Sequence, residues 1–276
     1  MEWHFETLVL FIALGSAAGF LGGLIGIGGG FILVPGLYYA FVQSSLAPGH
    51  ELPLVLGTTM AAILFTAASA VRTHLSRGVV RLDVVRRFAV WICAGAFLGS
   101  VLATSLSTTI VKLAFAIYCL YSGARMLVFP NAVGGNADVR RGSLAIPGTI
   151  FGTVCGLTGV GGANLFVPFL LKRSLDMRHA MATASALQMP IALIGSLAYI
   201  VLGAGKQTPA GALGFVYLPA LVVVAASSVA CAPAGARLAH RLPIATLKKV
   251  FGAVAAVVGL NMSGAVAWAA GVVRAL

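Results

Sequence analysis

Two short glycine-rich segments hold the residues of this chain that are best suited to bind a ligand. Residues 23 to 35 read GLIGIGGGFILVP, and residues 156 to 168 read GLTGVGGANLFVP. In each segment the glycines favour a break in an apolar helix, and we expect a short apolar helix that stops near a proline to follow. The N-terminus of such a helix offers free N–H groups and about half a positive charge to an anion. The glycines assigned to this anion site are Gly26, Gly28, Gly29, Gly30, Gly159, Gly161 and Gly162.

Polar side chains near these segments are candidates to complete the site. Asn164 directly follows the second glycine cluster, and the neighbouring apolar runs carry hydroxyl and amide groups. For the hydroxyl groups the alternative is a hydrogen bond to a carbonyl of their own helix, and for the glycines it is close helix packing. A nucleotide loop is excluded because the first segment lacks the Lys-Ser/Thr pair of a P-loop and follows no strand. The added candidates are Thr58, Thr59, Thr183, Ser185 and Gln188.

The composition places these segments in lipid. The chain has 276 residues, of which 60% are hydrophobic and 9% charged, whereas soluble domains carry about a quarter charged residues. Several charge-free runs are long enough to cross a hydrocarbon layer of roughly 30 Å as helices, and they do not alternate like barrel strands. Because lipid satisfies no backbone polar groups, the spans must be helical. The predicted fold is an all-α, polytopic helical membrane protein.

The two glycine segments belong to a longer internal repeat. Further along each half, six residues recur with one common spacing. We therefore expect two structural repeats, residues 1–130 and 142–276, joined by a polar linker at 131–141. The recurring pairs are Gly99 and Gly235, Leu106 and Leu242, Lys112 and Lys248, Phe115 and Phe251, Gly123 and Gly259, and Met126 and Met262.

The basic residues indicate how the halves lie in the membrane, because Lys and Arg concentrate in cytoplasmic loops. If every apolar run crossed the membrane once, the Lys and Arg residues would divide almost evenly between the two sides of the membrane. If each glycine block enters and leaves on one face, fifteen of the eighteen Lys and Arg residues lie on the same side. We therefore predict two inverted repeats, each a glycine-tipped re-entrant hairpin, or broken helix, plus about three transmembrane helices. The loops predicted to be cytoplasmic are 72–87, 125–141, 172–178 and 237–249.

The remaining composition excludes several functions. The net charge of +12 is explained by loops that orient spans, so we expect no nucleic-acid partner. The cysteines stand apart in apolar runs, and we expect no metal and no disulfide. Acidic residues are missing from the spans, which disfavours a buried proton relay or a cation site. Histidines at span boundaries offer no base to a nucleophile inside the bundle, so we expect no enzyme and no cofactor.

The paired segments GLIGIGGGFILVP and GLTGVGGANLFVP resemble those of the sulfite exporter TauE/SafE family of bacterial membrane proteins. The resemblance covers essentially the whole chain, including LPIATLKKVFG at 242–252. It implies an inner-membrane permease for small sulfur-containing anions, with exporters and importers among the members. It also implies that Gly26 to Gly30 and Gly159 to Gly162 are the characteristic loops of the family. Ala163 and Asn164 stand where the first half has Gly30 and Phe31, so the two loops need not contact substrate equally.

The leading hypothesis is a secondary transporter of the bacterial inner membrane that exports a small anion such as sulfite or an organosulfonate. The anion is held between the two half-helix ends and moved by alternating access. The alternatives are an anion channel and an importer of organosulfonates, and a membrane enzyme or sensor forms a third class. The expected partners are the anion and the lipid bilayer, while the coupling ion and a homodimer are left open.

Overall fold

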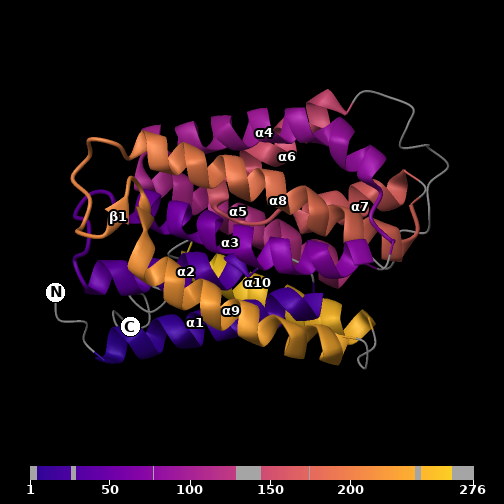
Figure 1. Ribbon diagram of the computed structural model, residues 1–276, viewed down its shortest axis with the longest axis horizontal. Helices are drawn as coiled ribbons and strands as arrows, with labels where there is room; N and C mark the ends of the chain where they lie inside the picture. The colour runs from indigo at the N-terminus through magenta and orange to yellow at the C-terminus, as the bar shows by residue number, and fades with distance from the viewer. Residues whose placement is uncertain are drawn as a thin grey trace, which may run out of the picture.

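The computed structural model describes residues 5–25, 29–76, 78–128, 144–173, 175–239 and 244–262. Within these ranges ten helices lie side by side as a bundle, and one two-stranded hairpin stands at an end of it (Figure 1). The all-α fold is thus confirmed. The helices are α1 (Phe5–Ile25), α2 (Gly30–Gln43), α3 (Glu51–Ser76), α4 (Leu82–Ser105), α5 (Thr108–Val128), α6 (Ala145–Thr158), α7 (Ala163–Lys172), α8 (Met177–Leu202), α9 (Leu218–Ala239) and α10 (Ile244–Met262), and the strands are β1 (Ala212–Leu213) and β2 (Val216–Tyr217).

The helix lengths agree with a polytopic membrane protein. Among the described residues, five helices are long and apolar enough to cross a bilayer, namely α1, α3, α4, α8 and α9. In contrast, α2 and α6 have 14 residues and α7 has 10, so they extend only about 15 to 21 Å. One difference concerns the first hairpin: α1 has 21 residues and can cross by itself. The first hairpin therefore joins a full-length helix to a short one, whereas the second joins two short helices.

The expectation that the short helices stop near their prolines is wrong. Helix α2 continues through Pro35, and α7 continues through Pro168. Each proline is the sixth residue of its helix, so its missing N–H removes only one hydrogen bond, to a carbonyl in the first turn. A proline so close to the helix start removes one hydrogen bond without ending the helix.

Rows of glycine fix the first helix of each hairpin to a helix of the other half of the chain. On α1 a Cβ added to Gly19 would lie 2.1 Å from the carbonyl oxygen of Ser228 on α9. On α6 a Cβ added to Gly152 would lie 2.3 Å from the carbonyl oxygen of Ile92 on α4. Small residues of this kind let helix backbones touch in a membrane. Close packing therefore explains these glycines, which recur every four residues as Gly15, Gly19 and Gly23 and as Gly148, Gly152 and Gly156.

Helices α3 and α8 pack against each other in opposite directions. A Cβ added to Gly57 would lie 2.9 Å from Tyr199 Cβ, and one added to Gly195 would lie 3.2 Å from Met60 Sδ. Residue numbers therefore rise along α3 as they fall along α8. These two helices hold the same place in the order of elements of the two predicted repeats.

Helices α5 and α10 also run in opposite directions. A Cβ added to Gly123 would lie 3.0 Å from the carbonyl oxygen of Gly252, and one added to Gly259 would lie 3.1 Å from that of Ala116. Inverted halves require such antiparallel pairing of equivalent helices. The repeat itself stays a prediction, and its linker lies outside the described residues. The predicted division is 1–130, 131–141 and 142–276.

Basic residues gather at one end of the bundle. Figure 1 shows β1 at one end and α7 at the other. At the α7 end, α3, α5 and α9 finish and α4 and α8 begin, because successive long helices alternate in direction. Lys112 and Lys206 belong instead to the β1 end, where α5 starts and α8 finishes. The described basic residues near the α7 end are Arg72, Arg81, Arg86, Arg87, Arg125, Lys172, Arg173, Arg178 and Arg237.

Candidate functional site

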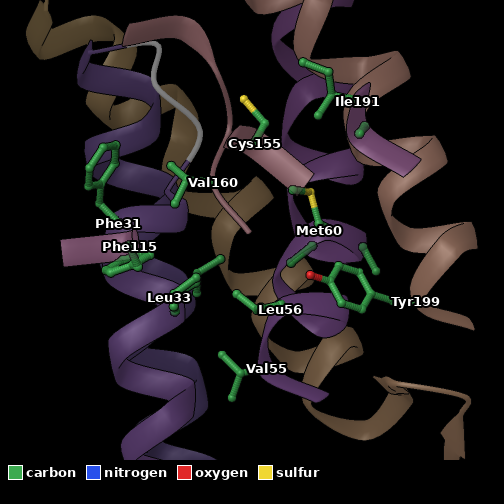
Figure 2. Packing of buried hydrophobic residues seen from close by; sticks show 14 of the residues in the cluster. Phe31, Leu33, Val55, Leu56, Met60, Phe115, Cys155, Val160, Ile191 and Tyr199 are labelled. Carbon is green, nitrogen blue, oxygen red and sulfur yellow. The ribbon is translucent and has the colours of Figure 1, made fainter. Parts of the chain in front are cut away.

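The two glycine segments meet inside the bundle. A Cβ added to Gly30, the first residue of α2, would lie 3.1 Å from the carbonyl oxygen of Gly159 and 3.1 Å from the Cα of Val160. Gly30 and the whole α6–α7 loop, Gly159 to Gly162, are buried. Figure 2 shows Val160 of this loop among buried side chains that include Phe31, Leu56 and Cys155. The two segments thus form one contact, although they are far apart in the sequence.

Glycine is needed at each break because the backbone there is left-handed. Gly159 ends α6 with φ of +69° and donates its N–H to the carbonyl of Cys155 at 2.9 Å, a common way for a helix to end. Gly29 precedes α2 with φ of +41°. Space is restricted as well, since a Cβ on Gly159 would lie 2.6 Å from Leu56 Cδ2. The other two candidates of the first segment, Gly26 and Gly28, lie outside the described residues.

The start of α7 presents backbone donors to this contact. Leu165 and Phe166 donate their N–H groups to the carbonyl of Gly162, at 2.9 and 3.0 Å. Within the described part of the chain, the N–H groups of the four residues from Gly161 to Asn164 donate to no backbone carbonyl. The first N–H groups of a helix lack intrahelical acceptors, and the helix dipole adds positive potential there. The α7 end is therefore a place where an anion is stabilised.

Asn164 brings the side chain best placed to act with those donors. Its side chain is in the first turn of α7, the residue is 7% exposed, and neither Oδ1 nor Nδ2 has a hydrogen-bond partner among the described residues. Because Cβ bonds tilt toward the N-terminus of a helix, we expect the amide to lie on the glycine side of its own Cα. A buried amide without partners costs about 1–3 kcal/mol per group. At the equivalent place in the first half, Phe31 instead stacks on Tyr118 with ring centroids 5.4 Å apart.

Three of the predicted hydroxyl groups are used within the protein. Thr58 donates to the carbonyl of Leu54 at 2.6 Å and accepts a hydrogen bond from the N–H of Tyr217 at 3.0 Å. Thr183 accepts one from the N–H of Arg81 at 3.1 Å. Ser185 donates to the carbonyl of Met181, one turn earlier in its own helix. For Ser185 the bond to its own helix, which the sequence left as an alternative, is what the structure contains.

The hydroxyl candidates do not lie at one level of the bundle. Thr59 stands between Leu56 and Ile63 on α3, the two residues that border the glycine contact, and its buried hydroxyl has no hydrogen-bond partner among the described residues. The antiparallel register of α3 and α8 puts Thr59 beside residues near 196 of α8. Thr183 lies about 13 residues, or roughly 20 Å, from this level, toward the start of α8. Ser185 and the buried Gln188 also lie in the first half of α8, away from the level of Thr59.

Two tyrosines reach the second glycine segment, and sequence reasoning missed both. Tyr199 on α8 donates to the carbonyl of Gly156 at 2.8 Å, and Tyr118 on α5 approaches the carbonyl of Gly161 at 3.5 Å. The carbonyls in the last turn of a helix need outside donors, and Tyr199 supplies one to α6. Nothing in the spacing of these tyrosines distinguishes them from packing residues in apolar helices.

Charged side chains are placed away from the glycine contact in the part of the chain that is described. Asp83 in the first turn of α4 is bonded to Arg81 through two oxygens, at 3.0 and 2.9 Å. Asp176 pairs with His179 at the α7 end of the bundle, and although burial opposes ionisation, the hydrogen bond and charge of His179 hold the pKa of this carboxyl below its usual value. No group of three or more His, Cys, Asp or Glu that could hold a metal ion occurs among the described residues. The groups named above at the glycine contact, namely backbone N–H groups, the Asn164 amide and the Thr59 hydroxyl, are all neutral.

Comparisons with known proteins agree with this architecture. The family model described as "Sulfite exporter TauE/SafE" matches residues 11–262. A protein of Haemophilus influenzae named "Probable membrane transporter protein" is 30% identical, over 94% of this chain and 98% of its own length. Proteins of Methanocaldococcus jannaschii and Bacillus subtilis, also named probable membrane transporter proteins, are 23% and 24% identical over 95% and 86% of this chain and 98% and 95% of their own lengths. No solved structure matches the chain significantly.

Proposed function

Because the chain belongs to the TauE/SafE sulfite exporter family, we propose that it is a secondary transporter that exports small sulfur-containing anions, such as sulfite or an organosulfonate, across the bacterial inner membrane. The observation that carries the proposal is the buried contact between the two glycine segments, Gly30 against Gly159 and Val160. A membrane transporter needs a substrate site remote from both surfaces, and inverted repeats place such sites where broken helices meet.

Backbone donors suit an anion at this place. The free N–H groups at the start of α7 and its dipole attract negative charge, and a dry site strengthens each of these interactions. A dipole contribution of about 0.3–2 kcal/mol and several charge-assisted hydrogen bonds of about 1.5–3 kcal/mol each offset the cost of removing the anion from water. The buried amide of Asn164 and the hydroxyl of Thr59 add neutral donors near this end. No acidic side chain is needed, and the described acidic residues stand in the first turn of a long helix or just before one, at the ends of the bundle.

Alternating access follows from the arrangement of the two halves, which we take as inverted repeats of residues 1–130 and 142–276. The described residues of the glycine contact are closed to solvent, as an occluded state requires. We assign the basic α7 end to the cytoplasm because Lys and Arg concentrate there. A net negative charge leaving the cell then moves with the membrane potential, which supplies about 2.3 kcal/mol per charge per 100 mV. Export therefore needs no coupling ion.

Flux measurements in proteoliposomes test the proposal. Vesicles loaded with sulfite, methanesulfonate or sulfate should release sulfite or the sulfonate only when they hold the purified protein. Imposing a potential that is negative inside should accelerate release. An absence of flux for every sulfur oxyanion would refute the proposal, flux at the rate of a pore would establish a channel instead, and preferential movement against the expected direction would favour an importer.

A further inference from the structure

We propose that Asn164 makes the site selective for a singly protonated oxyanion, one that carries an O–H group as well as acceptor oxygens. The inference rests on the proposed function and specifies its substrate class. Both amide atoms of Asn164 are buried and without hydrogen-bond partners among the described residues. An oxygen of the anion accepts from Nδ2, and the O–H of the same anion donates to Oδ1. Hydrogensulfite in its S–OH form is a sulfur anion with this pattern.

The reason lies in the donor and acceptor inventory of an amide. Oδ1 only accepts hydrogen bonds, whereas Nδ2 only donates them. A fully deprotonated oxyanion or a sulfonate has acceptors alone, so it satisfies Nδ2 but leaves Oδ1 facing another lone pair. A site built to pair with a substrate hydroxyl rejects an analogue without one, because its own polar group is then left buried and unpaired.

The backbone of α7 provides the complementary half of the recognition. The N–H groups from Gly161 to Asn164, just before and at the start of α7, are donors only, so they bind the unprotonated oxygens and cannot distinguish the two forms of the anion. Between the backbone N–H groups and the amide, the carbonyl end of the amide is the part that detects the proton. Burial acts in the same direction, since removing a doubly charged anion from water costs far more than removing a singly charged one.

Ionisable groups around the site do not obscure this selection. The titratable side chains that border the second glycine segment in the described residues are Cys155 on α6, Tyr118 on α5 and Tyr199 on α8. Thiols and phenols are neutral near pH 7. Neither α2 nor the part of α3 between Leu56 and Ile63 carries an ionisable side chain at the contact. The protonation that changes affinity is therefore that of the anion.

Binding of two anions to the purified full chain, measured by calorimetry in detergent, tests the inference. The first is sulfite, one pH unit below and one unit above the pKa of hydrogensulfite. The second is methanesulfonate, a permanent monoanion without an O–H group. Wild type should bind total sulfite up to about tenfold more tightly at the lower pH, the limit reached when only the singly protonated form binds, while its affinity for methanesulfonate should not change.

Substitution of Asn164 tests whether its amide is the source of the pH dependence of sulfite binding. Asn164→Leu keeps a side chain of similar shape but removes both polar amide atoms. It should reduce the ratio of the sulfite affinities at the two pH values to the part that the charge of the anion alone produces. Methanesulfonate should bind more weakly only because Nδ2 is lost. Asn164→Gln retains the amide and should keep part of the ratio if Leu is not tolerated. Asn261→Leu changes the same residue type at an exposed position on α10 and should behave like wild type.

Each outcome separates the two proposals. If wild type binds neither anion, the proposed function is wrong and the inference falls with it. If both anions bind but the sulfite affinity does not depend on pH, or if Asn164→Leu keeps the full ratio, only the inference is wrong. A water molecule bound permanently to Oδ1 would give a result of this second kind, in which both anions bind and only the inference is wrong.

Discussion

The backbone N–H of Tyr217 donates a hydrogen bond to the hydroxyl of Thr58 at 3.0 Å, across 159 residues of chain. A second bond of the same kind joins the N–H of Arg81 to the hydroxyl of Thr183 at 3.1 Å. Each donor directly precedes a helix, α9 or α4, and each acceptor belongs to the other half of the chain. One bond lies at the β1 end of the bundle and the other at the α7 end (Figure 1). If access alternates as proposed, an opening that separates the two halves at either end breaks one of these bonds.

Replacing Thr58 by valine should loosen the β1 end. The variant removes the acceptor of the Tyr217 N–H inside the protein, which costs about 1–3 kcal/mol. We expect thermal unfolding in detergent to begin several degrees lower and the Tyr217 amide to exchange hydrogen faster, as measured by mass spectrometry. Thr66→Val is the matched control, because the Thr66 hydroxyl donates only to carbonyls of its own helix. Equal effects of the two variants would contradict the role of the Thr58 bond.

Gly159→Ala should weaken anion binding by about tenfold or more. Its φ of +69° is unfavourable for alanine, and the new Cβ would lie 2.6 Å from the buried Leu56. Gly205→Ala provides the comparison, since Gly205 has φ of +75° but no atom within 4 Å of an added Cβ. Both variants bear the backbone strain of about 1–2 kcal/mol, and only Gly159→Ala displaces the glycine contact. Titration of sulfite by calorimetry checks this, and similar affinities for the two variants would argue against a site at the contact.

Removing the hydroxyl of Tyr199 should destabilise the end of α6. Tyr199→Phe leaves the carbonyl of Gly156 without the donor that lies 2.8 Å from it, a loss of about 1–3 kcal/mol. Tyr118→Phe should cost less, because its hydroxyl is 3.5 Å from the carbonyl of Gly161 and the stacking on Phe31 is kept. Denaturation curves of the two variants in one detergent measure the difference. The reverse order of stabilities would show that the longer contact is the stronger one.

Cysteine labelling should reveal which end of the bundle faces the cytoplasm. In a variant without the native cysteines, Lys206→Cys at the β1 end should react with a membrane-impermeant maleimide on intact cells. Arg178→Cys at the α7 end should react only after the cells are permeabilised. Both positions are exposed, so access from solvent is not the limiting factor. The opposite pattern would invert the assigned orientation, and with it the direction in which the potential drives the anion.

The sequence alone determined which elements form and where they break. The apolar length of a run fixes whether a helix can cross lipid, and the glycines of the two segments permit the left-handed backbone found at Gly29 and Gly159. Both are local properties, so they can be read from neighbouring residues. The family was also recognisable at this level, because the paired motifs stand in the sequence itself. The predicted stops at Pro35 and Pro168 failed because a proline near a helix start removes only one bond.

Only the tertiary structure decided how the candidate residues are used. Thr58, Thr59 and Thr183 look alike in the sequence, yet two of them bind backbone N–H groups of the other half and one has a buried hydroxyl without a partner among the described residues. The same holds for Tyr199, whose hydroxyl bonds to the end of α6. These roles depend on which helices lie side by side and in which register. Helix packing sets that register through many small contacts between distant segments, and no local pattern encodes it.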